Sequence, residues 1–396
     1  MTSVEPCSRA GPLPGRSFKE SPLHHVPFIV PVAELPFAGD AIVQPSNPDL
    51  AMPPPPCFDR RRLLLASAGL LAACGGGTDT PPAQSAGLQV GVEGLQGRIV
   101  RRLRGSPWGL MAATDAGLFL RTAMGWQARG LANRNLVDVA SVGGNRLVAS
   151  TLPVGMFESD DAGQSWRPLV SNWGGASGPE PAWTLLVDGA RLLANTSYGV
   201  GESMDGGRSW RLLAGDWDQV STGMFALSLA ANGDIWWGGQ NGIEQLVLGR
   251  RRASGRIDAW DRLLPSPSVV LTLRLVPEEP RRALLCAEGG IVQTRDEGLS
   301  WQPVYTNDDS RFYFDVLRDP VRPRRWVTAG WRKTDAAQPL RVDLSDDDGA
   351  TWRSLEHPEP QFFGGVWSMN VTVEDGRAVY RFGLYKGGVA RVIITA

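Results

Sequence analysis

One octapeptide occurs four times in the chain and constrains its fold more than any other feature. Its copies begin at Ser159, Ser203, Thr294 and Ser345, and each copy ends in a tryptophan. All four fit the pattern Ser/Thr-x-Asp-x-Gly-x-Ser/Thr-Trp without a gap. An Asp carboxylate can accept hydrogen bonds from the backbone of a tight turn, and Gly supplies a positive φ. Four copies of one turn therefore predict a repeat architecture.

Tryptophan spacing indicates the size of the repeat. The four motif tryptophans, and two that follow weaker copies of the motif, lie 40, 44, 50, 41 and 51 residues apart, at Trp126, Trp166, Trp210, Trp260, Trp301 and Trp352. Intervals of about 40–50 residues are typical of a four-stranded propeller blade. The composition agrees, because 47 Gly and 15 Trp in 396 residues favour short strands joined by tight turns.

The two ends of this array predict how the ring closes. Residues 384–392 match the third strand of a blade, and the sequence ends at residue 396. We expect residues 86–93 to add the missing outer strand, which would remove an exposed sheet edge. Counted in this way, residues 86–396 form an all-β, seven-bladed β-propeller closed by an N-terminal strand. Six or eight blades are the alternatives.

The octapeptide resembles the Asp-box, or BNR repeat, of sialidases, sortilin-type receptors, xyloglucanases and photosystem-assembly propellers. The resemblance implies that the Asp, Gly and Trp of each copy hold the turn between the third and fourth strands and pack neighbouring sheets, and that they do not catalyse a reaction. These structural residues are Asp161, Gly163, Trp166, Asp205, Gly207, Trp210, Asp296, Gly298, Trp301, Asp347, Gly349 and Trp352.

In overall layout, residues 86–396 are similar to the Ycf48/HCF136-like assembly-factor group, and more distantly to sialidases and sortilin-type propellers. This resemblance rests on the shared repeat, so no binding residue is carried over from it. It implies a non-catalytic scaffold that holds a protein partner at a membrane surface. The alternative is a sialidase-like or other glycoside hydrolase that uses carboxylates and a tyrosine. Residues 98–100 depart from the sialidase Arg-Ile-Pro motif, because position 100 is Val.

A basic and apolar segment near the N-terminus indicates export. Three arginines at 60–62 precede an apolar run of eleven residues at 63–73, and Cys74 follows. The run is shorter than the roughly 20 residues that a bilayer-spanning helix needs, so residues 52–73 are interpreted as an export signal. Residues 71–74 resemble a bacterial lipobox, which implies lipidation of Cys74, and residues 59–64 resemble a twin-arginine signal. The alternatives are a secretory signal without lipid and a buried apolar helix.

The flanking segments complete this interpretation. Residues 74–85 are expected to be a flexible tether. The resemblance to lipoproteins implies an outer-membrane location facing the periplasm, because residue 75 is Gly and not the Asp that favours inner-membrane retention in lipoprotein-sorting families. Residues 1–51 precede Met52, the expected start of the signal, and are expected to be untranslated. If they are translated, their high proline content predicts disorder.

Candidate binding residues fall in the loops expected around one end of the propeller channel. These loops, which join second to third strands and one blade to the next, surround what we call the mouth. The candidates are Asp115, Tyr198, Asn241, Glu288, Trp331, Arg332 and Tyr385. An aromatic rim of mixed charge suits a peptide, protein or carbohydrate partner. The alternative for each residue is an ordinary solvated loop tip.

Four further arginines, Arg318, Arg322, Arg324 and Arg325, are expected on the opposite face. They form either a solvated edge or a contact with anionic lipid.

Charge and residue types exclude several classes of function. Forty basic and 41 acidic side chains lack the positive excess of a general nucleic-acid binder. The three histidines are too few for a multi-histidine metal site or a His-dependent triad in the main domain. The four cysteines fit neither a zinc site nor a disulfide framework. We therefore expect no cofactor, no metal and no nucleic-acid partner.

Overall fold

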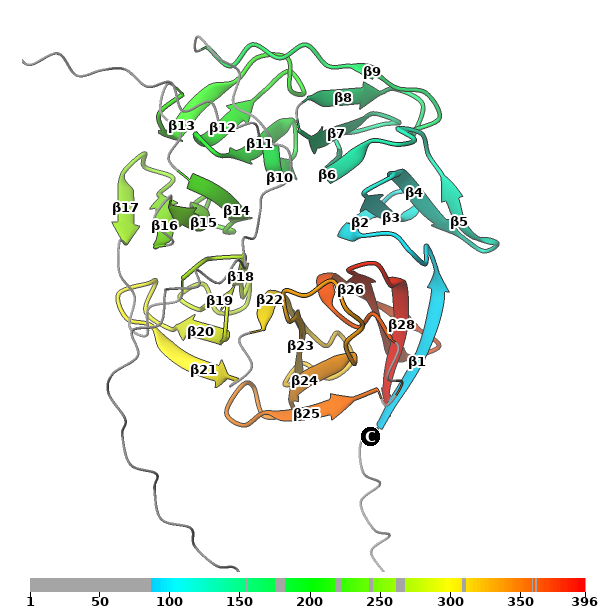
Figure 1. Ribbon diagram of the computed structural model, residues 1–396. Coiled ribbons are helices and arrows are strands. Elements are labelled where there is room, and N and C mark those ends of the chain that lie inside the picture. The colour runs from blue at the N-terminus through cyan, green and yellow to red at the C-terminus, as the bar shows by residue number, and fades with distance from the viewer. Residues whose placement is uncertain are drawn as a thin grey trace, which may run out of the picture. The chain divides into compact units, whose positions relative to one another are not determined.

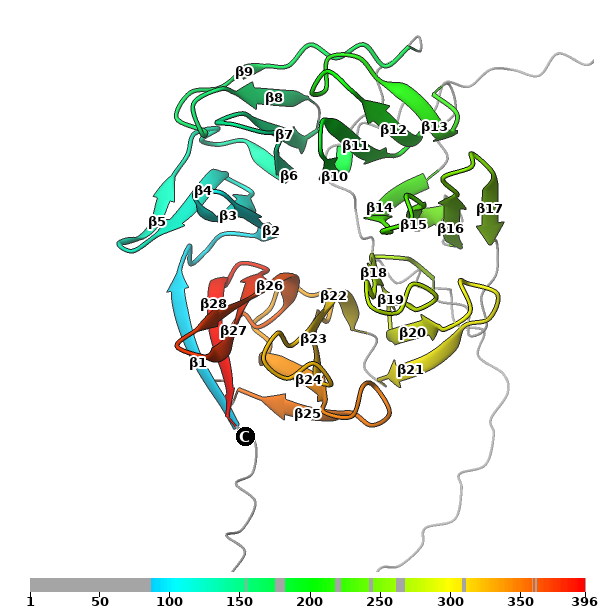
Figure 2. The ribbon, with the colours of Figure 1, turned by 180° about the vertical axis from the view of Figure 1, so that it is seen from behind.

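The described residues form a ring of seven four-stranded antiparallel sheets, seen from opposite sides in Figures 1 and 2. The computed structural model describes residues 87–153, 155–174, 182–217, 222–241, 245–260, 268–307, 311–357, 359 and 362–395. All of them belong to one compact unit, residues 37–396. The predicted seven-bladed β-propeller is confirmed. The expected signal, Cys74 and the tether lie outside the described residues, and no described helix is long and apolar enough to cross a membrane.

The first three blades follow one another along the chain. Within each blade the first strand lies nearest the centre of the ring and the fourth lies outermost. Blade 1 consists of β2 (Val100–Ser106), β3 (Gly109–Thr114), β4 (Gly117–Thr122) and β5 (Gly125–Ala128). Blade 2 consists of β6 (Asn135–Ser141), β7 (Leu147–Leu152), β8 (Met156–Ser159) and β9 (Arg167–Pro168). Blade 3 consists of β10 (Ala182–Asp188), β11 (Arg191–Thr196), β12 (Gly199–Ser203) and β13 (Arg211–Gly215).

The remaining blades complete the ring. Blade 4 consists of β14 (Thr222–Leu229), β15 (Ile235–Asn241), β16 (Leu246–Arg251) and β17 (Ile257–Trp260). Blade 5 consists of β18 (Thr272–Leu275), β19 (Ala283–Ala287), β20 (Gly290–Thr294) and β21 (Gln302–Thr306). Blade 6 consists of β22 (Phe312–Arg318), β23 (Trp326–Trp331), β24 (Arg341–Ser345) and β25 (Arg353–Glu356). Blade 7 consists of β26 (Val366–Glu374), β27 (Arg377–Leu384), β28 (Gly388–Thr395) and β1 (Gly87–Gly94).

Blade 7 closes the ring in the predicted way, because its outer strand comes from the other end of the chain. β1 pairs antiparallel with β28, from Gly87 opposite Thr395 to Gly94 opposite Val389. The Glu93 carboxylate reinforces this pairing by accepting hydrogen bonds from Arg381 of β27 at 2.9 and 3.1 Å. The expected strand at 86–93 is thus confirmed within one residue at each end.

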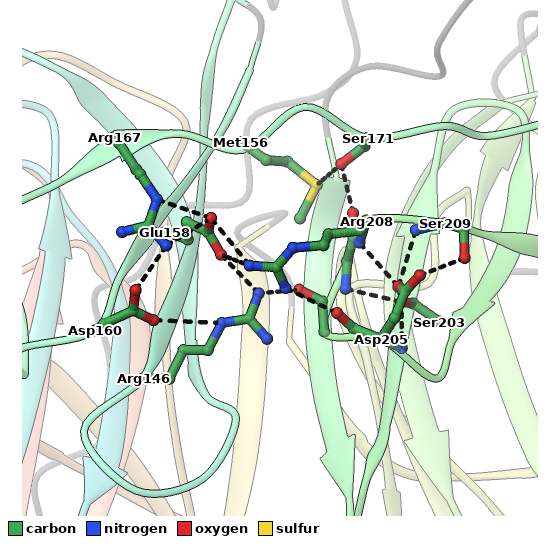
Figure 3. Close-up of polar contacts among 12 residues, drawn as sticks. Arg146, Met156, Glu158, Asp160, Arg167, Ser171, Ser203, Asp205, Arg208 and Ser209 are labelled. Atoms are coloured by element: carbon green, nitrogen blue, oxygen red, sulfur yellow. Dashed lines mark hydrogen bonds and ion pairs between the residues drawn. The ribbon is translucent and has the colours of Figure 1, made fainter.

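Each octapeptide forms the turn between the third and fourth strands of a blade, and the turn is held by one set of hydrogen bonds. In blade 3 the Asp205 carboxylate accepts from the Ser209 N–H at 2.8 Å and the Ser209 hydroxyl at 2.5 Å (Figure 3). The Ser203 hydroxyl donates to the same carboxylate at 2.8 Å and accepts from the Gly207 N–H at 2.7 Å. The same bonds recur around Asp161, Asp296 and Asp347.

Local chemistry keeps these turn carboxylates charged. Hydrogen bonds from the Thr351 hydroxyl and backbone lower the pKa of Asp347 to about 2. Burial raises the pKa of Asp205, but the Ser209 hydrogen bonds outweigh that effect and hold it at about 2. A carboxylate saturated by its own turn has no free proton to donate, so its environment fits the expected structural role. The four turns define what we call the motif face, opposite the mouth.

Arginine side chains on the innermost strands tie neighbouring blades together. Arg104 of blade 1 donates to Asp138 of blade 2 at 2.9 and 2.5 Å, and to the Leu185 carbonyl of blade 3 at 3.1 Å. Arg274 of blade 5 donates to both carboxylate oxygens of Asp315 of blade 6 at 2.6 Å. A guanidinium can bond two partners in fixed directions, so these pairs fix the angles between blades as well as their spacing.

Candidate functional site

The mouth contains a hollow of about 510 Å³ where blade 7 meets blade 1. Ring closure creates it, because the connection from β1 to β2 runs beside the turn between β27 and β28. The lining residues are Val92, Gln96, Gly97, Ile99, Asp115, Phe362, Phe363, Lys386 and Gly387. The lining thus offers apolar and aromatic surface together with one acidic and one basic side chain, a combination that suits a segment of another protein.

The two charged side chains of the hollow are held differently. Asp115 lies in the turn between β3 and β4, where its carboxylate accepts the Ile99 N–H at 3.1 Å. Its own N–H donates to the Ile99 carbonyl at 3.1 Å, so both backbone and side chain are fixed. Lys386 has a left-handed φ of 65° in the turn before β28, and its ammonium lies 3.3 Å from Asp335. A fixed acid and a long flexible base therefore line the same hollow.

An aromatic cluster lies beside the hollow and supports its wall. The ring centroids of Trp331, Trp367 and Tyr385 are 5.0 to 5.3 Å apart. The Arg101 guanidinium lies 5.1 Å from the Trp367 ring centre. Burial lowers the pKa of Arg101, although the charges of Asp115 and Tyr385 oppose that shift. These contacts link β2, β23, β26 and the turn that carries Lys386.

Trp331 does not belong to the exposed rim, which corrects the sequence-based expectation. Its side chain is 4% exposed, because rings from β22, β26 and the β27–β28 turn surround it. Its indole N–H donates to the Thr334 carbonyl at 3.1 Å. Trp331 therefore supports the mouth from within, and Tyr385, half-buried above it, is the member of the pair that a partner can reach.

Four other predicted candidates occupy mouth loops but do not line the hollow. Tyr198 packs against the tryptophan cluster of blade 3. Asn241 accepts the Gln245 N–H at 2.8 Å. Glu288 accepts the Ser268 hydroxyl at 2.6 Å, and the Arg332 N–H donates to the Gln338 side chain at 3.0 Å. The structure thus places all seven candidates in loops at the mouth, but only Asp115 of them lines the hollow, with Tyr385 next to it.

Phe363 and Lys386 line the hollow and belong to the loops expected around the mouth, although neither is one of the seven singled-out candidates. Phe363 is half-buried and lies in the connection from β25 to β26, where a backbone bridge to Gln338 holds it. The scarcity of lysine is the sequence feature that could have marked Lys386 as a site residue. Only three lysines occur in the chain, and the two that the structure describes, Lys333 and Lys386, both lie at the mouth. Their ammonium groups lie 5.3 and 5.2 Å from the ring centres of Phe312 and Tyr385.

The tyrosine hydroxyls at the blade interfaces have raised pKa values, which is the reverse of what a nucleophile needs. Burial, followed by the Asp343 charge, raises the pKa of both Tyr305 and Tyr313. Burial and a 2.6 Å hydrogen bond to Asp319 raise the pKa of Tyr380. A tyrosine nucleophile requires help in losing its proton, whereas these three hydroxyls hold theirs. No group of three or more His, Cys, Asp or Glu side chains within the described ranges is arranged to hold a metal ion.

Comparisons with known proteins establish the fold. No family model and no curated protein matches the sequence. Among solved structures, YCF48 from Cyanidioschyzon merolae is 15% identical, with a TM-score of 0.55 over 78% of this chain and 98% of that one. YCF48 bound to D1 peptide is also 15% identical, with a TM-score of 0.57 over 79% and 99%. This chain has the propeller fold of Ycf48.

An enzyme shares the same fold. The GH74 xyloglucanase from Xanthomonas campestris is 16% identical, with a TM-score of 0.55 over 76% of this chain and 53% of that one. At such identities the likeness concerns architecture alone, since one fold carries many activities. The expected layout of a Ycf48-like propeller is thus confirmed, and function must be argued from the mouth itself.

Proposed function

We propose that this protein is an exported lipoprotein, anchored through Cys74, whose propeller binds a segment of a partner protein at the mouth. The observation that carries the proposal is the hollow at the junction of blades 7 and 1. It combines apolar and aromatic surface with Asp115 and Lys386. A peptide supplies apolar side chains and both charges along one backbone, so it can satisfy all of these groups together.

Several features support a binding role over a catalytic one. The Asp residues of the four turns are saturated by their own turns. Tyr305, Tyr313 and Tyr380 have raised pKa values. A solved structure of the same fold carries the description "YCF48 bound to D1 peptide", which supports peptide binding by analogy of fold. The lipobox resemblance at residues 71–74 supports the membrane tether, and Gly75 supports an outer-membrane location.

Site-specific photocross-linking in the native membrane tests the proposal. A photoreactive phenylalanine analogue replaces Phe363 in the hollow, and in a matched variant it replaces Met124, an exposed residue on the motif face. We expect a defined protein adduct from position 363 and none from position 124. Substituting Asp115→Asn and Lys386→Gln together should reduce that adduct about tenfold or more, since the loss of two central contacts costs over about 1.4 kcal/mol. Equal adducts from both positions would refute a mouth-specific partner.

The glycoside hydrolase alternative has a separate test. The aromatic and carboxylate lining of the hollow also suits a sugar, and the xyloglucanase of the same fold makes a glycoside a reasonable substrate to assay. A hydrolase that uses Asp115 would release sugar from a panel of sialosides and glucans. The Asp115→Asn variant would lose that turnover while its melting temperature stays unchanged. A scaffold shows no turnover in either form.

A further inference from the structure

A second hollow, of about 310 Å³, opens on the motif face between blades 6 and 7. The turn between β22 and β23 forms one side of it, and the turn between β26 and β27 and the end of β28 form the other. Its lining includes Asp319, Arg322, Arg325, Arg377, Tyr380 and Thr395. Three guanidiniums and one carboxylate thus border a space large enough for a small ligand group.

The carboxylate and one of the guanidiniums are already satisfied within the protein. Asp319 is buried and accepts the Tyr380 hydroxyl at 2.6 Å and the N–H groups of Val321 and Arg322 at 2.8 Å. Arg325 is also buried, and its Nε lies 2.5 Å from Asp346. Both groups are therefore already engaged in buried contacts, Arg325 through its Nε.

The other two guanidiniums are free. Arg322 and Arg377 are exposed, and neither side chain has a hydrogen-bond or ion-pair partner among the described residues. Elsewhere the described arginines are mostly engaged, and Arg318 of the same expected cluster donates to the Pro323 carbonyl and pairs with Glu278. Two unpaired guanidiniums at one hollow provide planar donors that match the oxygens of a phosphate group.

The position of the hollow favours a membrane as the source of such a phosphate. Thr395, in its lining, bonds through its hydroxyl to the backbone N–H of Gly87 at 3.2 Å. The proposed tether at 74–85 therefore joins the propeller beside this hollow. Exposed apolar side chains lie on the same face, with Val321 in the hollow itself and Met204 and Leu299 in the octapeptide turns. Cationic and exposed apolar side chains together match the interface of an anionic membrane.

We infer that Arg322 and Arg377 bind the phosphate of an anionic phospholipid headgroup, so that the motif face docks on the membrane and the mouth points away from it. This inference relies on the proposed function only for the tether, because the two arginines and the hollow belong to the described propeller. The contact between these arginines and the headgroups would attach the propeller to the membrane at a second point, in addition to the lipid anchor. One attachment leaves the orientation of a propeller open, whereas two attachments on one face fix which side meets the membrane.

Vesicle sedimentation of the full chain carrying Cys74→Ser tests the inference without a covalent lipid. Vesicles of phosphatidylglycerol mixed with phosphatidylcholine are compared with vesicles of phosphatidylcholine alone, which report the contribution of the apolar run at 63–73. We expect the phosphatidylglycerol-dependent partition coefficient to fall about 30-fold in Arg322→Gln/Arg377→Gln. Each arginine near an anionic surface contributes about 1 kcal/mol, and 1.4 kcal/mol is tenfold.

A matched control removes the same charge from the other face. Arg98→Gln/Arg134→Gln lowers net charge equally but alters two exposed residues of mouth connections. We expect less than about a threefold change, because charges farther from the membrane than the roughly 8–10 Å Debye length are screened. An equal fall in both variants would mean a non-specific charge effect and overturn the inference. The melting temperature of the Arg322/Arg377 variant should match the parent, since neither side chain has a partner to lose.

Two further arms separate this inference from its alternatives. Calorimetric titration with inorganic phosphate measures the shared chemistry without a bilayer, and saturable phosphate binding with no preference for phosphatidylglycerol vesicles would overturn the lipid assignment in favour of a soluble phosphate. The photocross-link at position 363 is then repeated on the Arg322/Arg377 variant. A retained adduct with lost vesicle binding shows two independent sites. Retained vesicle binding in this variant overturns the lipid inference, whereas a parent that binds vesicles but gives no adduct at position 363 contradicts the mouth proposal alone.

Discussion

Replacing Glu158 by Gln should weaken the contact between blades 2 and 3 more than substitution of an exposed residue on the same turn. The Glu158 carboxylate accepts hydrogen bonds from Arg146 at 2.7 Å, Arg167 at 3.0 Å and Arg208 of the next blade at 2.9 Å (Figure 3). Arg146 also donates to the Gly206 carbonyl of blade 3 at 2.9 Å. One carboxylate thus accepts hydrogen bonds from three guanidiniums that belong to two blades.

The burial of these groups sets the size of the effect. The Glu158 side chain is 6% exposed, whereas its three arginine partners range from 21 to 54%. Removing one member of a buried pair costs about 3–5 kcal/mol, and partly solvated arginines reduce that to about 2–3 kcal/mol. For a propeller of about 310 residues, an unfolding entropy of about 2.1 cal/mol/K per residue converts this to a loss of about 4 °C in melting temperature.

Differential scanning calorimetry at neutral pH provides the measurement, with Asp160→Asn as the matched control. Asp160 pairs with Arg167 on the same turn, but both side chains are 54% exposed, so its loss should cost under about 0.5 kcal/mol and less than about 1 °C. A shift for Glu158→Gln no larger than that of the control would refute the inter-blade role.

The pH dependence of Glu158→Gln supplies a second check. Burial raises the pKa of Glu158, but the Arg146 hydrogen bond and the Arg208 charge outweigh burial and lower it. A lowered folded pKa means that the stabilisation is complete above the unfolded value of about 4.3 and is lost as the pH falls through the folded value. The difference in melting temperature between parent and variant should therefore shrink below about pH 4.

Three further substitutions probe the rest of the ring. Tyr380→Phe leaves the buried Asp319 carboxylate without its 2.6 Å donor and should cost about 1.5–3 kcal/mol in urea unfolding. Glu93→Gln removes the charge, and one of the two acceptor oxygens, that bind buried Arg381, and should speed amide hydrogen exchange in β1 before any other strand. Asp205→Asn should lower the melting temperature at pH 7 and approach the parent near pH 2, because the pKa of Asp205 is about 2. A gap that stays constant with pH would contradict this assignment.

The fold was predictable because its strongest signals are local. An Asp that closes its own turn acts within eight residues, so the octapeptide alone predicts the hairpin wherever it occurs. Blade 1 and blade 4 lack a full copy, and tryptophan spacing revealed them because Trp126 and Trp260 still pack against a neighbouring sheet. One detail was not predictable from the motif. Ala162, Glu297 and Asp348, which precede the motif glycines, also adopt a left-handed φ.

The site was predictable only to the level of the face. Strand order alone places all seven candidates at the mouth, but which of them meet depends on contacts between distant segments. Trp331 is buried because Trp367 and Tyr385, which lie 36 and 54 residues later, pack over it. The hollow exists because β1 and β28 pair across nearly the whole chain. Such long-range packing leaves no periodic pattern in the sequence.

The division between arginine and lysine follows the two tasks of the propeller. Arg104 and Arg208 each join blades through several directed hydrogen bonds, which a planar guanidinium makes at low entropic cost. An ammonium is a point charge on a flexible stem, and it cannot fix an angle between two sheets. The described lysines, Lys333 and Lys386, lie only at the mouth, where blade geometry does not depend on them. Rigid charge thus maintains the scaffold, and the flexible lysine charges lie at the mouth, where we propose that a partner segment binds.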